Sequence, residues 1–105
     1  MIVMNEKNSN GVQEYARKIE GLNDYIWFKF GKCWSNKTQS FIGYDNGHGY
    51  IQVTLTDDNG NVTHKMLHHM IWRAFGGRTL KKGETLNHKN ENPFDNSFDN
   101  LEAMT

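Results

Sequence analysis

The chain has 105 residues, a length typical of one domain, which excludes an enzyme with separate cofactor and substrate lobes. Twelve Lys and Arg residues balance twelve Asp and Glu residues, so the overall charge provides no attraction toward nucleic acid. The single cysteine, Cys33, excludes an intrachain disulfide and an all-cysteine zinc site.

The N-terminal part of the chain contains two segments with different residue patterns. Residues 1–10 are mostly polar and show no period, which predicts a flexible arm. Residues 12–22 place apolar side chains at helical spacing, which predicts a short amphipathic helix ended by Gly21 and Asn23.

From Asp24 onward the pattern favours strands. Aromatic and β-branched residues are interrupted by Gly and Asn, which predicts strands over 25–30 and 39–42 with a turn at Gly31. Apolar and polar residues alternate over 50–55, so we expect one buried face there. The sequence Asp-Asn-Gly-Asn at 58–61 is typical of a tight turn, which closes a hairpin onto residues 62–65.

Between Met66 and Phe75 the period changes to that of a helix. Apolar pairs recur every four residues and predict a helix that ends at Gly76. The opposite face is expected to carry His68, His69, Trp72 and Arg73, a set that would grip phosphates and stack on a base. The alternative is a partly covered surface with Trp72 in a small apolar cluster.

A basic stretch overlaps this helix and continues beyond it. One acid, Glu84, accompanies six basic residues between positions 62 and 89: Lys65, Arg73, Arg78, Lys81, Lys82 and Lys89. The stretch fits nucleic-acid binding, although an ordinary solvated basic face has the same composition. Beyond it, the apolar residues Leu86 and Leu101 flank a loop of Asn, Asp, Pro and Phe, which predicts a wide hairpin with a polar centre.

Three blocks of this region stand in a recognisable order: LHHMIWRAF over 67–75, LNHKNEN over 86–92 and NLE over 100–102. They resemble the homing-type HNH endonucleases common in phages and mobile introns, whose pattern reads V-H-R-L-V-A-x-A-F, [D/N]-H-x-D-G-N and N-N-x-x-x-N-L-x-W. The resemblance implies an α+β fold in which small antiparallel β-hairpins precede a helix and a ββα-metal motif. The expected division is an arm (1–10), a helix and hairpin region (11–65) and the HNH-like region (66–105).

The resemblance also assigns roles to three residues. His88 matches the general base, because a neutral imidazole with an ordinary pKa near ~6.5 accepts a proton from water. Asn87 matches the residue that holds one divalent cation, Mg²⁺ or Mn²⁺ with Zn²⁺ as a third choice. Asn100 matches the Asn that pins the two strands together and keeps the His88 loop in place. We expect all three side chains to share one polar pocket behind the 66–75 helix.

This sequence departs from the family pattern at several places. The family completes its metal site with a His or Asn on a helix after the second strand, whereas this sequence ends at Thr105 before such a helix. Asn90-Glu91 stands where relatives have Asp-Gly, and Ala103 stands where they have Trp. The missing helix leaves three hypotheses: the sequence is a fragment, a partner supplies the ligand, or the protein has kept the fold and lost cleavage.

Two other interpretations use the same residues. Asn87 and Asn100 lie where turn-forming asparagines are expected, and a loop histidine is commonly a surface residue. A zinc cluster of His64, His68, His69 and His88 is a further alternative, but it would need to bridge a strand and a helix.

The sequence therefore predicts a metal-dependent HNH-type DNA endonuclease, with His88 and Asn100 in the catalytic centre and Asn87 at the metal. The nucleic-acid contacts are expected from six residues: Trp72, Arg73, Arg78, Lys81, Lys82 and Lys89. The alternative is a non-catalytic phage protein that binds DNA or inhibits a host nucleic-acid or defence machine. DNA is the expected partner, with a host protein or a second copy of the chain as further ones. No apolar run approaches the ~20 residues that span a bilayer, so we expect a cytoplasmic protein without a membrane partner.

Overall fold

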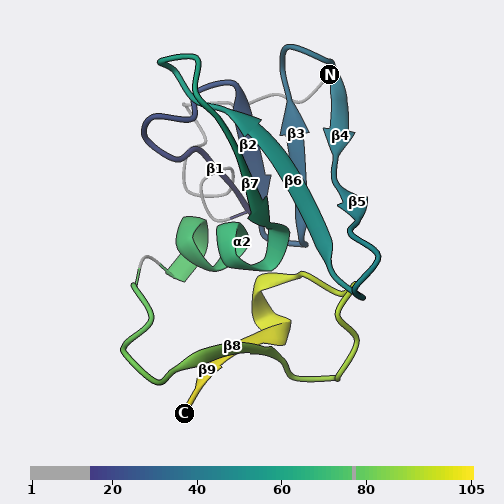
Figure 1. Ribbon diagram of the computed structural model, residues 1–105, viewed down its shortest axis with the longest axis vertical. Coiled ribbons are helices and arrows are strands. Elements are labelled where there is room, and N and C mark those ends of the chain that lie inside the picture. Colours follow the sequence, from purple (N-terminus) through teal and green to yellow (C-terminus); the bar gives the residue numbers. More distant parts are fainter. Residues whose placement is uncertain (1–14, 77) are drawn as a thin grey trace.

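The computed structural model describes residues 15–76 and 78–105 of the chain. The predicted N-terminal arm, residues 1–10, lies outside the described residues. Within them the chain forms three antiparallel sheets and the helix α2 (Leu67–Gly76), so the expected α+β class is confirmed. Figure 1 shows α2 in the middle of the molecule, with two sheets on one side and the third on the other.

The first sheet has the order β1-β2-β3-β4. Its strands are β1 (Ala16–Arg17), β2 (Tyr25–Phe28), β3 (Lys32–Ser35) and β4 (Ser40–Ile42). The register pairs Trp27 with Cys33 and Cys33 with Ile42, so these side chains share the face that points into the core. Both Trp27 and Cys33 are fully buried. Burial raises the pKa of the Cys33 thiol to about 12, so the thiol stays protonated and acts as a packing group.

The second sheet has the order β5-β6-β7, and its strands are β5 (Tyr44–Asp45), β6 (Ile51–Thr56) and β7 (Val62–Met66). The alternation predicted for this region is present, because Val53 and Leu55 are fully buried while Thr54 and Thr56 are exposed. The Tyr25 hydroxyl accepts a hydrogen bond of 2.8 Å from the Thr56 backbone N–H, which ties the first sheet to the second.

The third sheet is a hairpin of β8 (Thr85–His88) and β9 (Leu101–Met104), with a short 3-10 helix, η2 (Phe98–Asn100), just before β9. The two anchors expected from the sequence, Leu86 and Leu101, are buried. Together with α2 and the two sheets they form one core, whose most buried members include Trp27, Val53, Leu55, Leu67, Met70 and Ile71. Because α2 is covered by sheets on one side and by the hairpin region on the other, it connects the sheets to the C-terminal segment (Figure 1).

The helix predicted over residues 12–22 is wrong from Ala16 onward, although Tyr15 is helical. Ala16 and Arg17 pair with Phe28 and Trp27 as the edge strand of the first sheet. Beyond them, backbone hydrogen bonds from Leu22 to Ile19 and from Tyr25 to Leu22 close successive turns, and each spans three residues. A three-residue spacing of buried residues imitates the helical period, so the apolar stripe is core as expected while the backbone is not helical.

Across the described residues, the structure has no helix with the length and apolar character that crossing a membrane would require.

Candidate functional site

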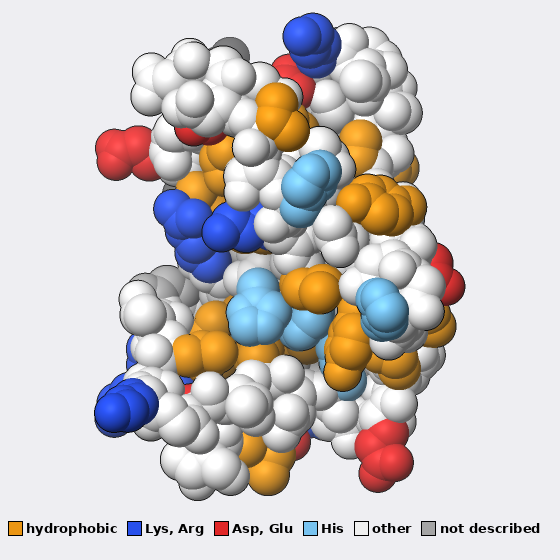
Figure 2. All heavy atoms as spheres, in the orientation of Figure 1, with side chains coloured by type: hydrophobic (Ala, Val, Ile, Leu, Met, Phe, Trp, Pro, Cys, Tyr) orange, Lys and Arg blue, Asp and Glu red, His pale blue; other side chains and the backbone are white. Residues whose placement is uncertain are grey.

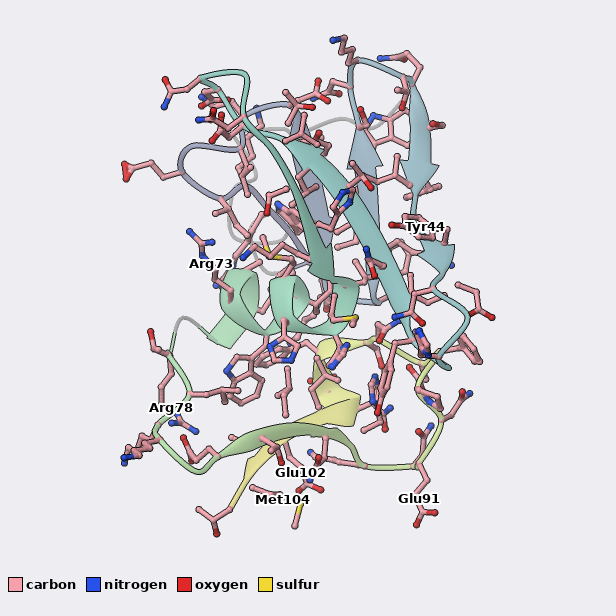
Figure 3. All side chains as sticks on the ribbon, viewed as in Figure 1. Tyr44, Arg73, Arg78, Glu91, Glu102 and Met104 are labelled. Carbon is pink, nitrogen blue, oxygen red and sulfur yellow. The ribbon has the colours of Figure 1, made fainter. Side chains whose placement is uncertain are left out.

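The β8–β9 hairpin presents two different faces. Directly opposed residues of an antiparallel pair point to the same side, and the register places His88 opposite Leu101 and Asn87 opposite Glu102. Since Leu101 is buried, His88 projects toward the core side of the hairpin, whereas Asn87 and Glu102 project to its other side. Figure 3 shows Glu102 on the side of the hairpin that lies away from α2.

A hydrogen bond to Asn96 orients the His88 ring. The Nε2 atom of His88 lies 2.9 Å from the Oδ1 atom of Asn96, whose side chain is buried with 3% of the residue exposed. An amide oxygen only accepts hydrogen bonds, so Nε2 must carry the proton in this contact. The free lone pair of a neutral His88 is consequently on Nδ1, and that atom is the one available to accept a proton.

Two further rings hold His88 from the side of the sheets. Its ring centroid lies 4.7 Å from that of His68 on α2 and 6.2 Å from that of Tyr50, next to β6. The His68 and Tyr50 rings stack on each other at 5.5 Å. Helix, sheet and loop therefore all contact the one imidazole, which limits the orientations that it can adopt.

The loop between β8 and η2 is fastened by Asn100. Its backbone carbonyl accepts a hydrogen bond of 2.7 Å from the Lys89 N–H, and its side-chain oxygen accepts one of 3.1 Å from the Asn90 N–H. Its side-chain nitrogen donates to the Asp95 carbonyl at 2.8 Å. A hydrogen bond from the Ser97 hydroxyl lowers the pKa of the Asp95 carboxyl, which keeps this loop residue charged at neutral pH.

An open pocket of about 460 Å³ lies at the end of β8, and it is lined by Tyr50, Asn87, His88, Lys89, Glu91 and Glu102 among others. It therefore combines one imidazole with an amide, two carboxylates and one ammonium group. His88 is half-buried in its wall, so the imidazole is accessible to solvent and to a ligand in the pocket.

The segment that contributes most of the pocket lining is similar to a known protein family. Residues 65–105 match the family model described as HNH endonuclease. The resemblance to the HNH family is confirmed. The match begins near the end of β7 and includes α2, the β8–β9 hairpin and the loop that carries Asn96 and Asn100.

A solved structure extends the HNH likeness to most of the chain. It comes from work on DNA binding and cleavage by the HNH homing endonuclease I-HmuI, and it matches 86% of this chain with a TM-score of 0.69 at 21% sequence identity. At that identity the match shows the shared fold. This chain spans 52%, about half, of the length of the I-HmuI chain. A search of the curated proteins finds no match.

The structure brings together two of the three residues expected in the HNH centre. Asn87 and His88 line the same pocket although they project from opposite faces of β8. Asn100 does not line that pocket, so the expectation of a single pocket shared by all three side chains is wrong for it. Its hydrogen bonds run instead to the backbone of the His88 loop, and this is the pinning geometry that the HNH resemblance implies. The catalytic and metal-binding roles stay predictions.

The residues expected to contact nucleic acid differ in their exposure. Arg73, Arg78, Lys81, Lys82 and Lys89 are all exposed, and Arg78 in addition donates a hydrogen bond of 2.8 Å to the Glu84 carboxylate. Trp72 is packed rather than open. Its Nε1–H donates to the Arg78 carbonyl at 3.1 Å and its ring lies 5.6 Å from that of Phe98, as in the alternative of a small apolar cluster.

His68 occupies a place that the sequence does not indicate. The helical pattern predicts it on the outer face of the helix, but only 5% of the residue is exposed. A single-sided helix would expose it, whereas α2 is covered on two sides, and His68 faces the His88 region on the second of them. Its Nδ1 atom is buried and has no hydrogen-bond partner within the described residues.

This burial predicts a pH-dependent stability. Desolvation, followed by the charges of His69 and His88, lowers the pKa of His68 from 6.5 to about 3. The folded pKa lies below the unfolded one, so the stabilisation is complete above pH ~6.5 and is lost as the pH falls toward 3, by at most about 1.4 kcal/mol per pH unit for one proton. Denaturant unfolding of the wild type and of His68→Phe between pH 4 and pH 8 measures it. As the pH falls, the free energy of unfolding of the wild type should decrease more than that of His68→Phe. If the two proteins lose stability in parallel, the lowered pKa of His68 is contradicted.

The donors around the pocket partly suit the divalent ion that the HNH resemblance implies. Within the described residues no group of three or more His, Cys, Asp or Glu side chains is arranged to hold a metal, which gives the alternative of a histidine zinc cluster no support. Asn87 and Glu102 offer oxygen donors on one face of the hairpin. Mg²⁺ is commonly held by one or two such oxygens together with waters and substrate phosphate. This pair therefore fits Mg²⁺ better than it fits an ion that needs all of its ligands from the protein.

Sequence reasoning missed three contributors to this site: Tyr50, Asn96 and Glu102. Asn96 could have been found, because the family pattern contains a second Asn four residues before the one matched by Asn100. Glu102 follows from pairing the strands in register once Leu86 and Leu101 are both assigned to the buried face. Nothing local to Tyr50 indicates that its ring meets a histidine 18 positions away in α2, because that contact depends on how sheet and helix pack.

Proposed function

We propose that this protein is a metal-dependent endonuclease that hydrolyses phosphodiester bonds in DNA. The observation that supports the proposal most is the state of His88. Its Nε2 atom is fixed by a buried amide, its Nδ1 atom is free to accept a proton, and its ring borders an open pocket within the HNH segment. The homing endonuclease I-HmuI, which shares the fold, binds and cleaves DNA, and this favours DNA as the substrate here.

In this proposal His88 acts as the general base. A water molecule in the pocket gives its proton to Nδ1 as its oxygen bonds to the phosphorus atom; the P–O bond to the leaving sugar oxygen breaks, and that oxygen takes a proton from solvent. The positive charge that develops on the ring is shared with Asn96 through Nε2–H. Asn96 therefore selects the tautomer and stabilises the imidazolium. His68, Tyr50 and the Asn100-fastened loop hold the ring and the backbone in place, so that little reorganisation is needed during the reaction.

A divalent cation, Mg²⁺ or Mn²⁺ with Zn²⁺ as a third choice, completes the proposed centre. Asn87 and Glu102 would hold it, and Lys89 lines the same pocket as a fixed positive charge beside the phosphate. When bound, the cation supplies neutralisation of the scissile phosphate and of the leaving oxygen.

The direct test is cleavage of a supercoiled plasmid by the purified protein. We expect nicked and then linear DNA in the presence of Mg²⁺ or Mn²⁺, and no product after the ions are removed with EDTA. Readdition of one ion should restore the products, which separates metal dependence from loss of folded protein. The absence of products with Mg²⁺, Mn²⁺ and Zn²⁺ alike would contradict the proposal.

A non-catalytic DNA-binding protein is the second candidate. The observation in its favour is the uncharged Asn87, because a neutral amide is a poorer ligand for a hard cation than a carboxylate. This candidate predicts salt-dependent DNA binding without cleavage under every metal condition above. Binding to a host protein, or pairing with a second copy of the chain, belongs to the same class and would be detected as a larger species on a sizing column.

A further inference from the structure

A second hollow, apart from the His88 pocket, runs along α2. It has a volume of about 690 Å³ and lies between the end of β7, the outer side of α2 and the segment 78–80; we call it the α2 groove. Its lining includes Lys65, Arg73, Arg78, His64 and His69, and no acidic residue of the described chain is part of it. Figure 2 shows Lys and Arg side chains gathered beside His side chains on the face of the molecule that lies over α2.

Two of the cations in the α2 groove are not neutralised. Arg78 is paired with Glu84, but Lys65 and Arg73 have neither an ion pair nor a side-chain hydrogen bond to any residue that the structure describes. Lys65 also repels a proton on His69: the pKa of His69 is lowered by desolvation, then by His88, then by Lys65. Positive charge is therefore concentrated in the α2 groove, whose own lining contains no carboxylate among the described residues, and an anion there would relieve that repulsion.

The α2 groove is continuous with the His88 pocket. An intermediate hollow, whose lining includes His68 and the Arg78-paired carboxylate of Glu84, shares Met66, His69 and Leu80 with the α2 groove. The same hollow shares Tyr50, Leu86 and Asn87 with the pocket that contains His88. A chain-like ligand can thus pass from Arg73 along the helix surface to the imidazole without leaving the surface of the protein.

The path along the α2 groove ends at Lys65 and Arg73. On the side away from His88, Lys65 and Arg73 also line a further hollow, together with the acids Glu20 and Asp57. Those carboxylates would repel a phosphate, so the favourable potential of the α2 groove ends at Lys65 and Arg73. Within it the neutral imidazole of His69 and the guanidinium of Arg73 lie one helical turn apart, a rise of about 6 Å, so Arg73 supplies the charge on α2 and His69 a polar ring beside it.

We propose that the α2 groove binds the phosphodiester backbone of the DNA strand on one side of the bond that His88 attacks, with Lys65 and Arg73 as its two principal phosphate contacts. This inference rests on the proposed function for its substrate and adds the path of that substrate. Phosphate contacts position the strand without reading its sequence, so the groove contributes affinity and register rather than base specificity. Trp72, whose ring is packed against Phe98, supports the groove wall and does not stack on a base.

The test measures binding of a short DNA duplex without divalent ions, so that cleavage does not interfere. The double variant Lys65→Ala/Arg73→Ala should bind more weakly by a similar factor on duplexes of unrelated sequence. Loss of two phosphate contacts should also flatten the plot of log K against log salt concentration by about 1.8, since each contact contributes about 0.9. The control Lys37→Ala removes one exposed lysine in the turn between β3 and β4 and should bind within error of the wild type.

Two further measurements separate this inference from the proposed function. The charge-preserving double variant Lys65→Arg/Arg73→Lys should bind like the wild type, which excludes misfolding as the cause. At saturating DNA the alanine double variant should cleave with the kcat of the wild type, and its weaker binding should appear as a higher KM. If the salt dependence of binding is unchanged in the alanine double variant, the α2 groove does not bind the DNA backbone, even if the wild type cleaves DNA. If the wild type does not cleave DNA under any metal condition but the alanine double variant shows the loss of two phosphate contacts, the proposed nuclease activity is overturned and the binding role of the α2 groove is supported.

Discussion

Replacing His88 by alanine is expected to reduce plasmid cleavage by about 100-fold or more, because a general base contributes on that order to the rate. DNA affinity should stay within error of the wild-type value, since the cations of the α2 groove are untouched. The measurement pairs initial cleavage rates in Mg²⁺ or Mn²⁺ with binding in EDTA on the same preparations. A loss of rate at constant affinity is the signature of a group that acts in the transition state.

A matched control for this variant is His48→Ala. His48 is exposed in the turn before β6 and does not line the His88 pocket, so removing its imidazole tests for a general effect of losing one histidine. Its cleavage rate should equal that of the wild type. If His88→Ala cleaved as fast as His48→Ala, the imidazole at position 88 would have no part in the reaction.

Elements with a local signal were predictable from the sequence. The alternation of Val53 and Leu55 with threonines, the four-residue recurrence in 66–75 and the anchors Leu86 and Leu101 each report which side of one element is buried. Such patterns need no knowledge of the partner element, because burial is imposed on the element as a whole. The HNH motif belongs to the same kind of signal, since its blocks are short and contiguous.

The errors have a common physical origin in packing between distant elements. The residues from Ala16 to Leu22 show a helical spacing, but the free edge of β2 offers backbone hydrogen bonds that the helix would forgo. His68 lies on a helix face that local patterning marks as polar, and it is buried because the hairpin region returns to cover that face. Local sequence determines periodicity, whereas the number of covered helix faces depends on the rest of the chain.

The same reasoning applies to the orientation of His88. The motif identifies the imidazole, but the partner that fixes its tautomer, Asn96, lies in a loop whose position depends on the first sheet. The Phe98 N–H donates a hydrogen bond of 2.8 Å to the Lys29 carbonyl, in the turn between β2 and β3. Gly31 in that turn lies so close to the backbone of Asn96 and Ser97 that a Cβ atom would not fit, so a turn more than 60 positions before Asn96 supports the loop that orients His88.

Gly31 is the residue of that turn whose replacement should affect the site most. It has a φ of +97°, and a Cβ atom there would lie 2.5 Å from the backbone carbon of Asn96 and 2.6 Å from the backbone nitrogen of Ser97. These are backbone atoms, which cannot rotate away as the end of a side chain can. We expect Gly31→Ala to lower the free energy of unfolding by at least about 2 kcal/mol and to displace the loop that holds Asn96.

Gly60→Ala separates the two causes of that loss. Gly60 has a φ of +87° in the turn between β6 and β7, and no atom lies within 4 Å of the position where its Cβ would be, so its replacement introduces the backbone strain alone. Denaturant unfolding should show a larger loss for Gly31→Ala than for Gly60→Ala. The cleavage rate per folded molecule should fall only in the former, because only Gly31 contacts the loop that orients His88. Equal losses of stability with unchanged cleavage in both variants would mean that the turn and the loop are not coupled.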